Sequence, residues 1–185
     1  MRPASAARRR LRLFARDQDG VGAVEFALVA PLLILLYLGG SELSMFLTLS
    51  RKVEHASSTI NDLVTQSSQL EKADFEGIFN VARAIVTPYD VGPLGITATS
   101  VAIDENGKQK VDWSYASANS QALAKGSTYL LPAAFAKERS RKILVVRTRY
   151  SYVPIAGTAI MAPRDIGSVS YLNPRVGSEV KCPSC

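Results

Sequence analysis

A long apolar stretch near the N-terminus constrains this chain more than any other feature. Between residues 21 and 50 the only charged side chains are Glu25 and Glu42, and residues 26–41 carry no charge at all. A bilayer core requires about 20 predominantly apolar residues, so the sequence predicts a membrane-spanning helix over residues 21–43. A carboxylate within such a helix costs about 2.5–3.5 kcal/mol at mid-bilayer on insertion scales. Glu25 is therefore predicted to serve a function.

Two simpler interpretations of this stretch stay open. It is also typical of a removable secretory signal peptide, with cleavage near Gly39-Gly40-Ser41. Alternatively, it is a plain single-pass anchor in which Glu25 is incidental. The long leader and the position of Glu25 at the start of the apolar run argue against the signal peptide, because an ordinary signal peptide gains nothing from a carboxylate there.

The charges in front of the apolar stretch predict its orientation. The 185-residue chain has 22 basic and 16 acidic residues, and residues 1–20 alone hold six arginines and two aspartates. Positive charge beside a first membrane helix stays in the cytoplasm, so the chain beyond residue 43 is predicted to be exported. Residues 21–185 hold 16 basic and 14 acidic residues, which is an excess of only two positive charges. The high pI of about 9.5 thus comes mainly from the leader arginines that set the membrane orientation. We expect no nucleic-acid partner.

The junction between leader and helix resembles a known processing signal. Gly20 closes the basic leader, Val21 follows it, and Glu25 and Phe26 stand five and six residues after the glycine. This spacing resembles the class III signal of type IV pilins. Together with the apolar residues 27–33 it is similar to the TadE family of the tight-adherence (Tad, or Flp) pilus.

The resemblance implies a function and a set of partners. It implies that a membrane prepilin peptidase cuts between Gly20 and Val21, and that Glu25 pairs with the new Val21 amine of a neighbouring subunit. It further implies that Pro31 marks a bend, and that the other partners are Tad pilins or pseudopilins, inner-membrane platform proteins and lipid. The expected product is a minor pilin or pseudopilin of the bacterial inner membrane that supports adherence or secretion. TadE and TadF subtypes stay open, as does the alternative of an unprocessed anchor or scaffold with a periplasmic interaction domain.

Beyond the membrane segment the helix is expected to continue to about residue 70. Apolar and small residues there recur at spacings of three and four, which is the period of an amphipathic helix. The stripe comprises Val53, Ala56, Ile60, Leu63, Ser67 and Leu70, with Asn61 among the residues assigned to the polar side. A separate soluble helix after a break at Gly39-Gly40 is the alternative.

The remaining residues predict a small α+β domain. Asp74 is a candidate cap for a helix that ends before Pro88, and Asn106-Gly107 between alternating segments predicts a hairpin. Residues 143–153 predict a central strand, residues 168–172 a last strand, and the polar stretch up to Thr128 partial helix. We therefore expect an antiparallel sheet packed on the long helix. The expected units are a leader (1–20), membrane helix (21–43), helix continuation (44–73), α+β domain (74–175) and tail (176–185).

Chemistry-bearing motifs are sparse. The sequence has one histidine, His55, and no nucleotide, zinc-protease or nucleophile-elbow motif, so we expect no enzyme activity, no cofactor and no metal site. Cys182 and Cys185 end the chain. In an oxidising compartment they can pair with each other, although free thiols or links between chains stay open.

Overall fold

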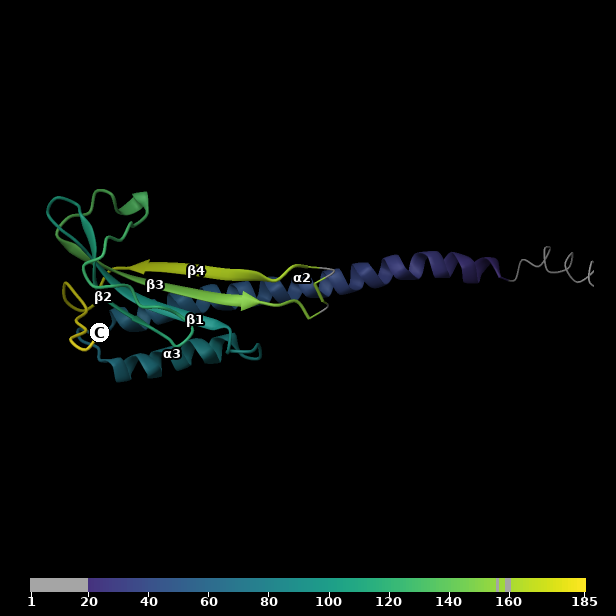
Figure 1. Cartoon of the computed structure of the whole chain (residues 1–185), viewed down its shortest axis with the longest axis horizontal. Coiled ribbons are helices and arrows are strands. Elements are labelled where there is room, and N and C mark those ends of the chain that lie inside the picture. Colours follow the sequence, from purple (N-terminus) through teal and green to yellow (C-terminus); the bar gives the residue numbers. More distant parts are fainter. Residues whose placement is uncertain (1–19, 156, 159–160) are drawn as a thin grey trace, which may run out of the picture.

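The computed structural model describes residues 20–155, 157–158 and 161–185. It consists of one long helix whose first half projects from a small α+β head (Figure 1). We call the projecting part, Val21–Ser41, the stem, and the described residues from Glu42 onward the head. Apart from Gly20, the predicted leader lies outside the described residues.

The long helix, α2 (Val21–Thr65), runs from the stem into the head without interruption. The alternative of a break at Gly39-Gly40 is therefore wrong. The helix ends five residues earlier than predicted, so Ser67 and Leu70 lie beyond it. Its buried face includes Leu49, Val53, Ala56, Ser57, Ile60, Asn61, Val64 and Thr65.

Two assignments on this helix need correction. Leu63 is only partly buried, and Val64 takes the core position because it stands four residues after Ile60. Asn61, assigned to the polar side, is fully buried. It is tolerated there because its amide donates to the Leu144 carbonyl at 3.3 Å and to the Ser170 hydroxyl at 3.1 Å.

Four antiparallel strands form a single sheet in the order β2-β1-β3-β4. Their bounds are β1 (Leu94–Ile103), β2 (Gln109–Ala116), β3 (Arg141–Tyr152) and β4 (Arg164–Leu172). The predicted hairpin is confirmed between β1 and β2, where Gly107 takes the positive φ of 80° that a tight turn requires. The predicted central strand is also confirmed, since β3 pairs with β1 on one side and β4 on the other.

A second helix, α3 (Lys72–Val86), lies beside α2. Its N-cap is Glu71, not the predicted Asp74, which occupies the third helical position. Asp74 still contributes, because its carboxylate accepts the Glu71 backbone N–H at 2.7 Å in a capping box. At the other end, Lys52 of α2 donates to the carbonyls of Ile85 and Thr87 and so caps the last turn of α3.

Both helices cover the same face of the sheet. α2 packs against β3 and β4, and α3 places Phe75 against Trp113 and Tyr115 of β2, with ring centroids 5.8 and 4.8 Å apart. Polar side chains tie α2 to the strand above it: Ser57 donates to the Val146 carbonyl at 3.0 Å and Thr148 to the Val53 carbonyl at 3.2 Å. The expected α+β fold, with an antiparallel sheet on the long helix, is confirmed.

The segment between β2 and β3 folds against the opposite face. Partial helix was predicted up to Thr128, but residues 117–128 form turns and irregular chain that end in a β-bridge from Thr128 to Lys110. The only helical piece described in this segment is a short 3₁₀ turn, η1 (Ala133–Phe135). The physical reason is the free edge of β2. Val111 donates to the Ser127 carbonyl and accepts from Gly126, so the segment satisfies its backbone by pairing with the strand.

The C-terminal residues are held against the head. Trp113 donates its indole N–H to the Val180 carbonyl at 2.7 Å, and Leu70 donates its backbone N–H to the Lys181 carbonyl at 2.8 Å. Cys182 and Cys185 are joined in a disulfide with a Cα–Cα distance of 5.4 Å. This end of the chain lies on the side of the head opposite the stem (Figure 1).

Candidate functional site in the stem and at its junction with the head

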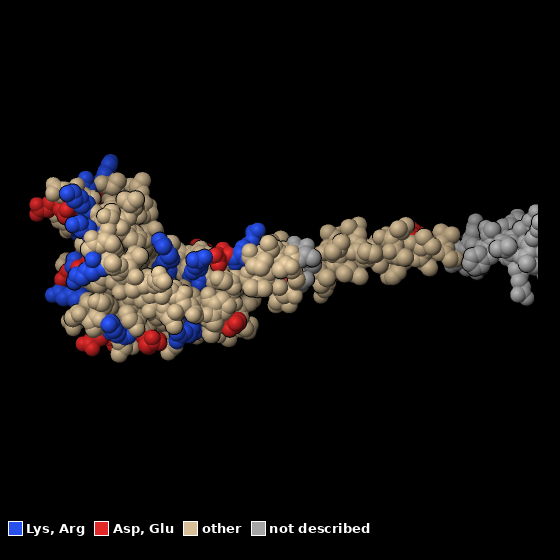
Figure 2. Space-filling model, in the orientation of Figure 1, with Lys and Arg blue, Asp and Glu red and all other residues tan. Residues whose placement is uncertain are grey.

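The stem is an apolar helix that the head does not cover. No described residue from Val21 to Ser41 is buried, and large side chains such as Leu28 and Tyr37 are 75% and 76% exposed. Figure 2 shows charged side chains distributed over the head, whereas the stem carries almost none. A core helix of similar length and composition in a soluble protein is mostly buried. The stem therefore has the surface of a single-pass membrane anchor.

The length of the stem fits a bilayer. At a rise of 1.5 Å per residue, the helix from Val21 to Ser41 is about 30 Å long, which is the thickness of a typical hydrocarbon core. Glu42, the next residue, is the first fully buried one in α2. The apolar exposed segment thus ends where the head begins.

The residues predicted for processing and assembly lie at the free end of the stem. Gly20 is the N-cap of α2, and its carbonyl accepts the Val24 N–H at 3.1 Å. A Cβ built on Gly20 meets nothing among the described residues within 4 Å, so the fold itself does not demand glycine there. Val21 and Glu25 stand four residues apart, which places them one turn apart on the same side of the helix. Glu25 is exposed and Phe26 is 69% exposed.

Pro31 lies inside the stem. Proline has no backbone N–H, so the carbonyl of Ala27 loses its usual helical partner. The helix nevertheless continues on both sides of Pro31. Cys182 and Cys185, also singled out from the sequence, lie far from these residues at the other end of the molecule.

A site that the sequence did not reveal lies at the junction of stem and head. The Glu42 side chain is 1% exposed, and its Oε1 accepts a hydrogen bond from the Tyr152 hydroxyl and one from the Ile155 N–H at 3.3 Å. The Tyr152 ring meets Phe46 edge-on at 5.5 Å. These contacts fasten the end of β3 to α2 at the point where the stem emerges.

The chemistry of this junction is that of a buried polar pair. Burial raises the pKa of the Tyr152 hydroxyl well above its usual value, and the hydrogen bond to Glu42 and the charge of that carboxylate raise it further. The hydroxyl therefore stays protonated and donates. The sequence places Glu42 at the end of the predicted membrane helix but does not reveal its partner, which stands 110 residues away.

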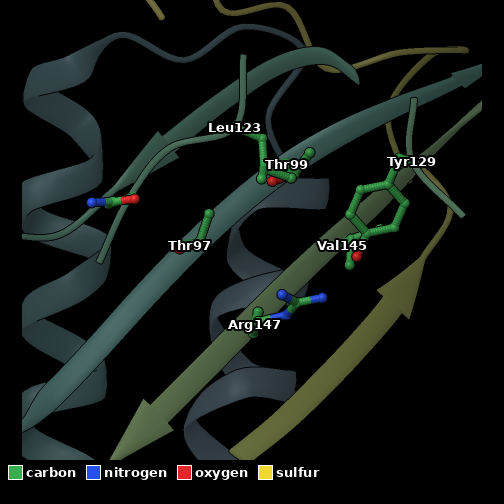
Figure 3. A pocket seen from close by; sticks show the side chains of 7 residues that line it. Thr97, Thr99, Leu123, Tyr129, Val145 and Arg147 are labelled. Carbon is green, nitrogen blue, oxygen red and sulfur yellow. The ribbon is translucent and has the colours of Figure 1, made fainter. Parts of the chain in front are cut away.

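The outer face of the sheet has a small polar cavity. It has a volume of about 40 Å³ and is lined by Thr97, Thr99, Gln121, Leu123, Tyr129, Val145 and Arg147 (Figure 3). One buried water needs at least about 10–15 Å³ on the same measure, so the cavity has room for only a few waters. Among the described residues, no group of three or more His, Cys, Asp or Glu side chains is placed to hold a metal.

Comparison with protein families bears on the stem and the adjoining part of α2. Residues 20–60 match the family model described as TadE-like protein. This segment is therefore similar to TadE-like proteins. The match relates the chain to the Tad pilus system and begins at Gly20, the N-cap of α2.

The TadE-like segment comprises about a fifth of the chain and ends within α2, so α3 and the sheet lie outside it. No curated protein and no solved structure matches the chain. The family match therefore concerns α2, whereas α3 and the sheet are described from the structure alone.

Proposed function

We propose that this TadE-like chain is a minor pilin or pseudopilin that takes part in assembly of the Tad (Flp) pilus. In this proposal the stem crosses the bacterial inner membrane once, with residues 1–19 in the cytoplasm and the head in the periplasm. A prepilin peptidase removes the leader between Gly20 and Val21. The chain itself acts through contacts with other Tad pilus proteins and not as an enzyme.

The start of the family match carries this proposal. It coincides with the first turn of an exposed apolar helix whose length fits a bilayer. The open surroundings of Gly20 add support: because the fold has room for a side chain there, a need for glycine would come from a partner that approaches the backbone.

The proposed role of Glu25 follows from the cost of a charge in lipid. Cleavage before Val21 creates a cationic amine one turn from Glu25. A carboxylate and an amine that pair between neighbouring subunits each offset the other's desolvation, so the pair favours one axial register of the stems. The exposure of Glu25 leaves it available for such a contact.

Processing is tested by replacing Gly20 and measuring the intact mass of the protein made with its peptidase. Gly20→Leu is expected to leave a precursor that retains residues 1–20. Gly22→Leu is the matched control, because Gly22 also has nothing within 4 Å of a built Cβ. A mature protein from Gly20→Leu contradicts the cleavage site, and a precursor from Gly22→Leu alone moves the cut by two residues. Cleavage near Gly40 identifies a secreted protein, and no cleavage of the unaltered chain identifies an anchor or scaffold.

Assembly is tested by Glu25→Ala in cells that make the pilus. The variant is expected to remain in the membrane, since the change makes the stem more apolar, but to lose piliation and adherence. Glu54→Ala, which removes an exposed glutamate from the head portion of the same helix, is the control and is expected to leave pili normal. Normal pili from Glu25→Ala contradict the register role.

A further inference from the structure

The residues that directly follow β3, up to Ile155, lie against α2 at the base of the stem. Tyr152 ends β3, and the following residues turn so that the Ile155 N–H reaches Glu42 at 3.3 Å. Because Glu42 directly follows the stem, the backbone of Ile155 lies at the level where the apolar helix leaves the head. Figure 1 shows the end of β3 beside α2 at that point.

The composition of the connection between β3 and β4 differs from that of an ordinary surface loop. Residues 153–163 contain no charged side chain. Two large apolar side chains in it, Val153 and Ile155, are 64% and 78% exposed although core positions on β3 lie close by. Arg164 follows the connection directly, and its guanidinium lies over the Phe46 ring at 5.8 Å from the centroid. Two exposed apolar side chains and a cation thus lie near the base of the stem.

A shallow hollow extends the apolar surface around the base of the stem. Its volume is about 370 Å³. Residues of α2, of the connection between α3 and β1 (Asp90 among them), and of the end of β3 and the chain directly after it line the hollow. Its lining includes Met45, Pro88, Tyr89, Tyr150, Val153 and Ile155. Apolar and tyrosine side chains gathered at one level of a membrane helix are typical of the bilayer interface.

We propose that Val153 and Ile155 insert into the interfacial layer of the outer leaflet and give the head a second contact with lipid. The proposal rests on the proposed placement of the stem across the membrane. Lipid is the occupant that the position favours, because this surface is continuous with the stem and lies at the end of its bilayer-length segment. Arg164 stands where its guanidinium can reach lipid phosphates while the methylene groups of its side chain stay on apolar surface.

Depth measurements on the full-length chain test this proposal. The protein is reconstituted in vesicles of phosphatidylcholine and phosphatidylglycerol, with one introduced cysteine carrying an environment-sensitive fluorophore. Cys182 and Cys185 are paired, so labelling without reductant is selective. The test position is Ile155→Cys, and the exposed apolar control is Leu130→Cys, which is 86% exposed beside the β1–β2 hairpin at the other end of the sheet. Leu33→Cys reports on the stem.

Spin-labelled lipids then report which positions contact the bilayer. We expect lipids labelled near the headgroup to quench the probe at Ile155, mid-chain labels to quench that at Leu33, and neither to quench that at Leu130. Quenching at Leu33 without quenching at Ile155 overturns the loop contact and leaves the spanning stem intact. Absence of quenching at Leu33 overturns the proposed membrane placement and this inference with it. A blue shift at Ile155 that grows with protein density and is not quenched by lipid overturns the inference by assigning the surface to a second copy.

Discussion

The hydrogen bond between Tyr152 and Glu42 provides a quantitative test of how stem and head are joined. We consider Glu42→Ala, Tyr152→Phe and the double variant. Tyr152→Phe removes only the hydroxyl and retains the ring that packs on Phe46. Glu42→Ala removes the acceptor of both the Tyr152 hydroxyl and the Ile155 N–H.

The structure sets the expected size of these effects. A hydrogen bond to a charged group contributes about 1.5–3 kcal/mol, and a buried donor left without an acceptor costs about 1–3 kcal/mol. Tyr152 is 5% exposed and Glu42 1%, so water cannot easily replace either partner. We expect Tyr152→Phe to lower the free energy of unfolding of the head by about 2 kcal/mol and Glu42→Ala by about 3 kcal/mol. The coupling free energy should be about 1.5–3 kcal/mol.

The assay uses the single tryptophan of the chain. Trp113 is 3% exposed and packs on Phe75, so its emission reports unfolding of the head. The full chain is held in detergent micelles and titrated with urea, and each variant gives a midpoint and a slope. Glu42→Gln serves as a control because it keeps an acceptor and should lose less than Glu42→Ala.

Two results would refute this reasoning. A coupling free energy below about 0.5 kcal/mol would mean that Tyr152 and Glu42 do not act together. Equal losses for Glu42→Gln and Glu42→Ala would mean that the charge matters and the hydrogen-bond acceptor does not.

Three further predictions concern the head. Asn61→Ala should lower the free energy of unfolding by about 1–2 kcal/mol, measured by urea titration, because a β3 carbonyl loses its amide donor; no loss would contradict a structural role for this buried amide. A double serine variant of Cys182 and Cys185 should still fold, with a loss of no more than about 2 kcal/mol because the disulfide closes a four-residue loop; collapse of the variant would contradict this. The hydrogen bond and charge of Lys142 hold the pKa of Glu179 below its usual value of 4.5. This pair therefore stabilises the head above about pH 4.5, and its contribution is lost as the pH falls through the lowered pKa. Glu179→Gln should reduce the acid sensitivity of the unfolding midpoint, and an unchanged pH profile would contradict the pairing.

Local patterns in the sequence predicted much of the fold. The uncharged run predicted the stem, Asn106-Gly107 predicted the hairpin, and the β-branched residues of β3 predicted a central strand. Each of these signals depends on neighbours along the chain. The family resemblance likewise depended on a contiguous stretch, residues 20–33, which lies within the matched residues 20–60.

The errors share a different cause, which is dependence on partners distant in sequence. Asn61 looks like a solvated helix residue and Glu42 like a charge at the end of the membrane helix, until β3 supplies an acceptor for Asn61 and a donor for Glu42. The polar residues 117–128 had a composition compatible with helix, but the free edge of β2 offered a better match for their backbone. The functional role of Gly20 and Glu25 remains a prediction, because the contacts it requires lie with other proteins.

The continuity of α2 has a mechanical consequence. The same helix that forms the stem runs beneath β3 and β4, so a pull along the stem slides the helix lengthwise against the sheet. Ser57, Asn61 and Thr148 then bear the load in parallel, as does the side-chain packing around them. A force in this shear direction must break these contacts together, whereas a force across the helix axis would separate them one after another. A subunit drawn out of the membrane by its stem would therefore bring the folded head with it.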